Sequence, residues 1–131
     1  MHAVARAYVS WALSHPARFK LVFGRWAGAA PELRSAAEAV RGEWLRVVTE
    51  AQRAGCLPAG DPARLAALVQ ATAHGAADLA YAGHLSEGSA VRTLPGHLVD
   101  ELLDCLEEAA GGTGNAESGI GPAGGGSDGS R

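Results

Sequence analysis

The sequence contains few of the residues that favour β-sheets. Isoleucine occurs once, at Ile120, and aromatic residues make up only 5% of the chain, whereas alanine occurs 28 times. Alanine favours helices, while β-branched and aromatic side chains favour strands. The composition of these 131 residues therefore predicts a single all-α domain and excludes an extensive sheet, barrel or sandwich.

Cysteine and long apolar runs are also scarce. Cys56 and Cys105 are the two cysteines, and neither belongs to a metal-binding motif. Isolated cysteines in an alanine-rich domain fit a reducing compartment better than a disulfide, although a disulfide between them stays an alternative. The sequence has no apolar run of about 18 residues and no signal-peptide pattern at its N-terminus. We therefore expect a soluble cytoplasmic protein that makes no membrane contact.

Charge is limited, and its two signs are unevenly distributed. Residues 1–53 hold eight Lys or Arg against four Asp or Glu, whereas residues 54–131 hold three against ten, so that the net charge is −3. The eight cations are spread over three predicted helices, a pattern typical of solvated faces. Because nucleic-acid binding needs a concentrated positive surface, we expect no direct DNA contact from this chain.

Prolines and glycines divide the first 110 residues into five segments whose apolar side chains recur every three or four positions. Proline is favoured in the first turn of a helix and glycine just after the last turn, which sets most of the expected boundaries. We expect an antiparallel bundle of about five helices, over residues 2–14, 16–26, 31–54, 62–85 and 95–110. Residues 111–131 hold nine of the 18 glycines, so we expect a folded domain at 1–110 and a Gly/Ser-rich disordered tail at 111–131.

The last two predicted helices carry more apolar surface than helices at the edge of a small bundle can bury. The fourth has a face of small residues that allows close helix packing, and the fifth has a wide leucine stripe. Surfaces of this kind mark interfaces, so we expect a homodimer built as a four-helix bundle around a two-fold axis. The alternative is that the same chain covers this stripe. The expected interface residues are Leu68, Ala73, Ala76, Ala77, Ala80, Leu98, Leu102 and Leu106.

Most of the aromatic residues lie in the first three predicted helices. Large rings that pack against many alanines leave gaps, and the single methionine supplies no flexible filler, so we expect an apolar pocket for a small hydrophobic ligand. The alternative is that the rings form an ordinary core. His74 and Asp78, one helical turn apart, would either add polar groups to the pocket or form hydrogen bonds at the dimer interface, but two such residues do not complete a metal site. The expected ligand-binding residues are Trp11, Phe19, Phe23, Trp26, Trp44, His74, Asp78 and Tyr81.

No catalytic pattern is present in the sequence. It has neither a nucleophile elbow nor a phosphate-binding loop with Gly-Lys-Ser/Thr. Residues 119–124, GIGPAG, match the dinucleotide-binding fingerprint, but they lie in the predicted tail without a strand before them or a helix after them. We therefore expect no enzyme activity, no cofactor and no metal, and a small helical enzyme is the least favoured alternative.

Residues 8–23, YVSWALSHPARFKLVF, resemble the start of the ligand-binding domain of TetR-type transcriptional regulators. The shared features are an aromatic-rich helix, a His-Pro junction and a helix with two aromatic residues four positions apart. His74-Gly75 with Leu79 and Gly83 resembles the subgroup named for its Trp, His and Gly, although positions 70–73 hold no tryptophan. The resemblance covers about residues 4–108.

The resemblance implies a C-terminal regulatory domain that forms a homodimer through its last two helices and senses a small hydrophobic effector. It implies contact with operator DNA only through an N-terminal helix-turn-helix head, which we expect to be absent from this chain. A helical module that binds a different protein, without a small-molecule ligand, is the alternative function.

Overall fold

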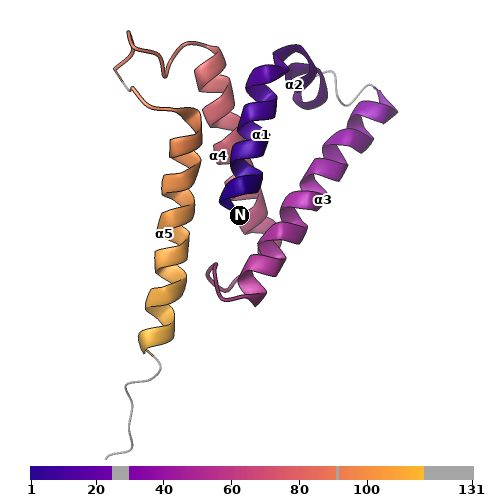
Figure 1. The fold of residues 1–131 in the computed structure, drawn as a ribbon. Coiled ribbons are helices and arrows are strands. Elements are labelled where there is room, and N and C mark those ends of the chain that lie inside the picture. The colour runs from indigo at the N-terminus through magenta and orange to yellow at the C-terminus, as the bar shows by residue number, and fades with distance from the viewer. Residues whose placement is uncertain (25–29, 91, 117–131) are drawn as a thin grey trace, which may run out of the picture.

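The computed structural model describes residues 1–24, 30–90 and 92–116. Within these ranges the regular secondary structure is helical, with turns and loops between the helices and no strand (Figure 1). The predicted all-α fold is therefore confirmed. The five helices are α1 (His2–Ser14), α2 (Pro16–Phe23), α3 (Pro31–Arg53), α4 (Pro62–Tyr81) and α5 (Pro95–Ala116).

The helix boundaries follow from local chemistry. Proline occupies the first turn of α2, α3 and α4, and the side chain of Asp61 caps α4 by accepting a 2.9 Å hydrogen bond from the amide of Ala63. Gly55 and Gly83, with φ of 74° and 80°, follow α3 and α4 in the left-handed conformation that glycine adopts most easily. Gly83 ends α4 at Tyr81, four residues earlier than the predicted end at residue 85.

Two other boundaries differ from the prediction by three residues or more, whereas α3 ends one residue before its predicted end. Helix α2 ends at Phe23 instead of residue 26, and residues 25–29 lie outside the described ranges. Helix α5 continues through Gly111 and Gly112 to Ala116, whereas a disordered tail was predicted to begin at residue 111. Once α5 is held by packing, each added residue contributes a hydrogen bond without a new nucleation cost, which offsets the unfavourable helix propensity of glycine. Residues 117–131 lie outside the described ranges.

Helix α1 lies in the centre of the molecule, with α3 and α5 on opposite sides of it and α4 behind it (Figure 1). Helix α4 packs against α1, α3 and α5, and α1 also packs against α5. Buried side chains from all of these helices form the main core, among them Val9, Trp44, Val48, Val69, Ala73, Val99 and Leu103. Among the helices in the described ranges, none has both the length and the apolar character that crossing a membrane requires.

Candidate functional site

An aromatic cluster forms where α1, α2, α3 and α4 meet. It consists of Tyr8, Phe19, Phe23, Trp44 and His74. The ring of Tyr8 makes edge contacts with Trp44 and Phe19 at centroid distances of 5.7 and 6.2 Å. Phe19 and Phe23 lie 4.5 and 5.4 Å from the imidazole of His74. Helices α1 and α2 therefore place rings directly against the histidine of α4, and Trp44 of α3 joins the cluster through Tyr8.

The corner between α1 and α2 brings the two phenylalanines into this cluster. Pro16 starts α2 immediately after His15, whose Nδ1 lies 3.1 Å from the carbonyl oxygen of Trp11 and whose ring stacks on the Trp11 indole at 5.9 Å. Phe19 and Phe23 are four residues apart, so they project from the same face of α2. The local sequence at the corner thus aims both rings at α4.

The polar groups of the cluster are neutral at neutral pH. The hydroxyl of Tyr8 lies 3.2 Å from Nδ1 of His74. Burial raises the pKa of Tyr8 to about 12, and a hydrogen bond with Gln70 only partly opposes this rise. Burial lowers the pKa of His74, against a smaller opposite effect from the charge of Asp78. A hydroxyl and an imidazole, both uncharged, therefore stand among apolar rings, which suits a mostly apolar ligand with one polar group.

The structure brings together Phe19, Phe23, Trp44 and His74, four of the residues expected to bind a ligand. Trp11 reaches the edge of the cluster, since its ring lies 6.4 Å from that of Phe19 while its side chain stays exposed.

The other expected ligand-binding residues lie elsewhere. Asp78 is exposed, and Tyr81 is 55% exposed beneath the ammonium group of Lys20, 4.1 Å from the ring centroid. Trp26 lies outside the described residues. Tyr8 was omitted from the expected site, although its position three residues before Trp11 on the apolar face of α1 was an available signal.

The aromatic cluster is filled by its own rings. Phe19 and Trp44 are 4% and 2% exposed, whereas Phe23 is partly exposed. Three open pockets on the molecule lie elsewhere, and no residue of the aromatic cluster lines any of these three. None of these three pockets is therefore the apolar pocket expected among the aromatic rings. Because Phe23 is more exposed than Phe19, a ligand that approached the cluster would contact Phe23 first.

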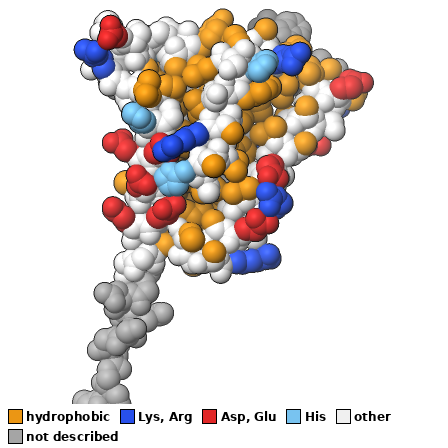
Figure 2. Space-filling view, in the orientation of Figure 1, with side chains coloured by type: hydrophobic (Ala, Val, Ile, Leu, Met, Phe, Trp, Pro, Cys, Tyr) orange, Lys and Arg blue, Asp and Glu red, His pale blue; other side chains and the backbone are white. Residues whose placement is uncertain are grey.

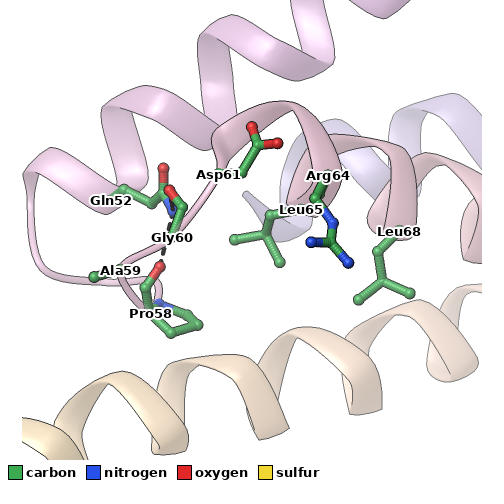
Figure 3. Close-up of a pocket in the computed structure, with 8 residues that line it drawn as sticks. All are labelled: Gln52, Pro58, Ala59, Gly60, Asp61, Arg64, Leu65 and Leu68. Carbon is green, nitrogen blue, oxygen red and sulfur yellow. Dashed lines mark hydrogen bonds between the residues drawn. The ribbon is translucent and has the colours of Figure 1, made fainter.

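One of the three pockets lies at the loop between α3 and α4 and has a volume of about 390 Å³ (Figure 3). Gln52 shapes it by donating from Nε2 to the carbonyl oxygens of Pro58 and Gly60, at 2.8 and 3.3 Å. Leu65 and Leu68 of α4 form its apolar side (Figure 3). A second pocket, of about 420 Å³, lies between α1 and the start of α5 and includes Arg6 and Asp100.

The residues expected at a dimer interface fall into two groups. Ala73, Ala76 and Ala77 are 0, 3 and 2% exposed, so they pack inside their own chain, and Ala80 is partly buried. Leu68 of α4 is 46% exposed, and Leu79 of the same helix, which was not among the expected residues, is 44% exposed. The expected residues of α5, all partly exposed, are Leu98, Leu102 and Leu106.

Comparison with known proteins identifies the family. A family model described as the tetracyclin repressor-like C-terminal domain matches residues 1–106. No curated protein and no solved structure gives a significant match. The matched range ends within α5 and includes the whole aromatic cluster.

Proposed function

The chain belongs to the family of tetracyclin repressor-like C-terminal domains, and we propose that it is the dimerisation and effector-binding domain of a TetR-type transcriptional regulator. Two features of the structure support the proposal. Helix α4 carries exposed leucines and packs against α5, which carries partly exposed leucines, and an aromatic cluster contains a neutral histidine.

The observation that carries the dimer is an apolar surface along α4 and α5, called the flank. It is formed by Leu68 and Leu79, which are exposed, and by Leu98 and Leu102, which are partly exposed. Helices α4 and α5 pack side by side, so these leucines extend over two adjacent helices. In each chain Leu68 and Leu79 are close to half exposed. Two copies related by a two-fold axis would bury the flank against itself, as in an intermolecular four-helix bundle.

We expect the wild-type chain to sediment as a dimer at micromolar concentration, and Leu68→Glu to weaken the dimer at least about tenfold. Burying the exposed half of a leucine contributes about 1 kcal/mol, and the two-fold axis doubles the loss. Leu21→Glu is the matched control, because Leu21 is 50% exposed on α2, away from the flank. Sedimentation velocity measures the change, and circular dichroism checks that helix content is kept.

A wild-type monomer, or an L68E protein that dimerises as tightly as L21E, would contradict the proposed interface. A monomer that associates only with a different protein would favour the alternative function, a helical interaction module.

The observation that carries effector binding is the accessibility of Phe23 at the edge of the aromatic cluster. Phe23 is partly exposed and contacts both His74 and Tyr8, at 5.4 and 6.0 Å between ring centroids. A ligand that displaced this ring would contact Phe19 and the imidazole beneath it. An apolar ligand with one hydrogen-bonding group matches these surroundings.

We expect some members of a library of uncharged hydrophobic compounds to raise the melting temperature of the chain, because a ligand that binds only the folded state stabilises it. Phe23→Ala is expected to abolish or change the set of stabilising compounds. Leu21→Ala, an exposed position on the same helix, should leave the set unchanged. Differential scanning fluorimetry with all three proteins is the measurement. An equal response of F23A and wild type would contradict this location, and no response across the library would contradict effector binding.

A further inference from the structure

A polar seam joins α1 to α5 on the face that also shows the acidic side chains of α5 (Figure 2). The polar seam consists of His2 and Arg6 from α1 and Asp100, Asp104 and Glu107 from α5. His2 and Arg6 are four residues apart, and the three acidic residues are spaced by four and three, so each set lies on one face of its helix. The two faces meet because α1 packs against α5.

The imidazole of His2 is held in a defined orientation. Its Nδ1 lies 2.9 Å from Oδ1 of Asp100, and Asp100 accepts bonds from Nε and Nη2 of Arg6 at 3.0 and 2.9 Å. The Asp100 side chain is only 14% exposed. An ionised carboxylate only accepts hydrogen bonds, so Nδ1 of His2 is the donor and the second ring nitrogen, Nε2, points the other way.

Two further carboxylates converge on Nε2 of His2. Oδ1 of Asp104 lies 3.5 Å from it and Oε1 of Glu107 lies 3.3 Å from it. Both distances exceed the usual N–H···O range of about 2.7–3.2 Å. They match instead the separation of about 3.3 Å between two ligand atoms bound tetrahedrally to one ion at about 2.0–2.1 Å. The three ligand atoms all lie within 4.8 Å of one another.

The polar seam also has an excess of negative charge, which a bound cation would offset. Three carboxylates face one guanidinium group, and with a neutral imidazole the lone pair of Nε2 would point at two negatively charged groups. Either a proton on Nε2 or a metal ion between the three groups relieves this repulsion. The pairing of His2 with Asp100 is the arrangement in which metal-binding histidines are usually held, with the distal ring nitrogen donating to a carboxylate.

We propose that His2, Asp104 and Glu107 bind a divalent transition-metal ion, with Asp100 as the residue that positions the imidazole. One imidazole and two carboxylates suit Zn²⁺, Co²⁺ or Mn²⁺, and among these Zn²⁺ binds most tightly to such ligands. Water completes the coordination, because the Asp104 and Glu107 side chains are 65 and 41% exposed. The ion would connect the first turn of α1 to the middle of α5.

The test is isothermal titration of ZnCl₂ into the untagged full chain carrying Cys56→Ser and Cys105→Ser, because both thiols are exposed and cysteine thiolates are zinc ligands. We expect one ion per chain. Asp104→Asn, Glu107→Gln and His2→Gln should each weaken binding at least about tenfold, and Asp100→Asn about 10–100-fold. Glu101→Gln and Glu108→Gln, which remove the same charge from exposed positions of α5, should leave the affinity unchanged.

Equal affinities of D104N and E108Q would overturn the proposal, as would the absence of a saturable site in the parent protein. NMR gives an independent readout, with Zn²⁺-induced shifts expected in the imidazole of His2 and in residues 100–107. A His2 ring that carries protons on both nitrogens and does not respond to Zn²⁺ would identify the polar seam as an ion-pair cluster and would also overturn the proposal. Neither result bears on dimerisation or effector binding.

Discussion

Trp44→Ala is expected to lower the free energy of unfolding by about 3–5 kcal/mol, the cost of removing a large buried aromatic side chain and leaving a cavity. Trp44 is 2% exposed, and its ring contacts that of Tyr8 at a centroid distance of 5.7 Å. It joins α3 to α1 in the main core. Because small domains have a total stability of about 5–15 kcal/mol, the loss would be a large part of the whole.

Trp11→Ala is the matched control for this prediction. Trp11 is 37% exposed and lies at the edge of the aromatic cluster, so its truncation leaves less unfilled volume. Urea unfolding followed by far-ultraviolet circular dichroism measures both variants, and it avoids the change in tryptophan fluorescence. A W11A protein that loses as much stability as W44A would contradict the assignment of the core.

Ala73→Glu is expected to prevent cooperative folding at neutral pH. Ala73 is 0% exposed within its own chain, so a glutamate there would be buried without a partner. Burial of a carboxyl group raises its pKa by up to about 3–5 units, so a glutamate buried at this position would be protonated at neutral pH. Protonating a group whose ordinary pKa is about 4.3 costs about 4 kcal/mol at pH 7. The extra volume adds strain of about 1–3 kcal/mol. The sum reaches the stability expected for a domain of this size.

Ala71→Glu separates the effect of burial from the effect of charge. Ala71 lies two residues away on α4 and is exposed, so the same substitution should change stability by no more than about 0.5 kcal/mol. Thermal unfolding by circular dichroism is the measurement. If A73E folds as well as A71E but fails to dimerise, Ala73 lies at an interface between chains. That result would contradict the burial of Ala73 within its own chain.

The boundaries of the helices were largely predictable because they depend on local chemistry. Pro31 and Pro62 begin helices where proline costs no hydrogen bond, and Gly55 ends one where the chain turns into the left-handed region. The predicted end of α4 at residue 85 was wrong, although Gly83, which follows the helix in the left-handed conformation, was an available signal for an earlier end. The extension of α5 to Ala116 was not predictable from glycine content alone, because packing of the preceding turns supports it.

The candidate site was predictable only in part. Phe19 and His74 were expected from their chemistry, but nothing in the helical periodicity of α4 distinguishes His74, beneath the phenylalanines, from Tyr81 two turns later on a similar face. The spacing of apolar residues in the sequence shows which face of a helix is apolar. The packing of neighbouring helices decides which part of that face is buried. The polar seam escaped sequence analysis because its ligands come from opposite ends of the chain, at His2 and at residues 100–107.

The sequence by itself determined an all-α chain, the start of each helix and the faces that must be removed from water. Only the tertiary structure decided which surface buries each of these apolar faces. Ala73, Ala76 and Ala77 have small side chains that allow close approach of another helix, and the amino-acid sequence does not specify whether that helix belongs to the same chain. In the fold these alanines pack against their own chain, whereas Leu68 and Leu79 stay exposed, and we propose a second copy as the surface that covers them. The hydrophobic effect is non-directional, so it favours the burial of apolar area equally whether the same chain or another chain covers it.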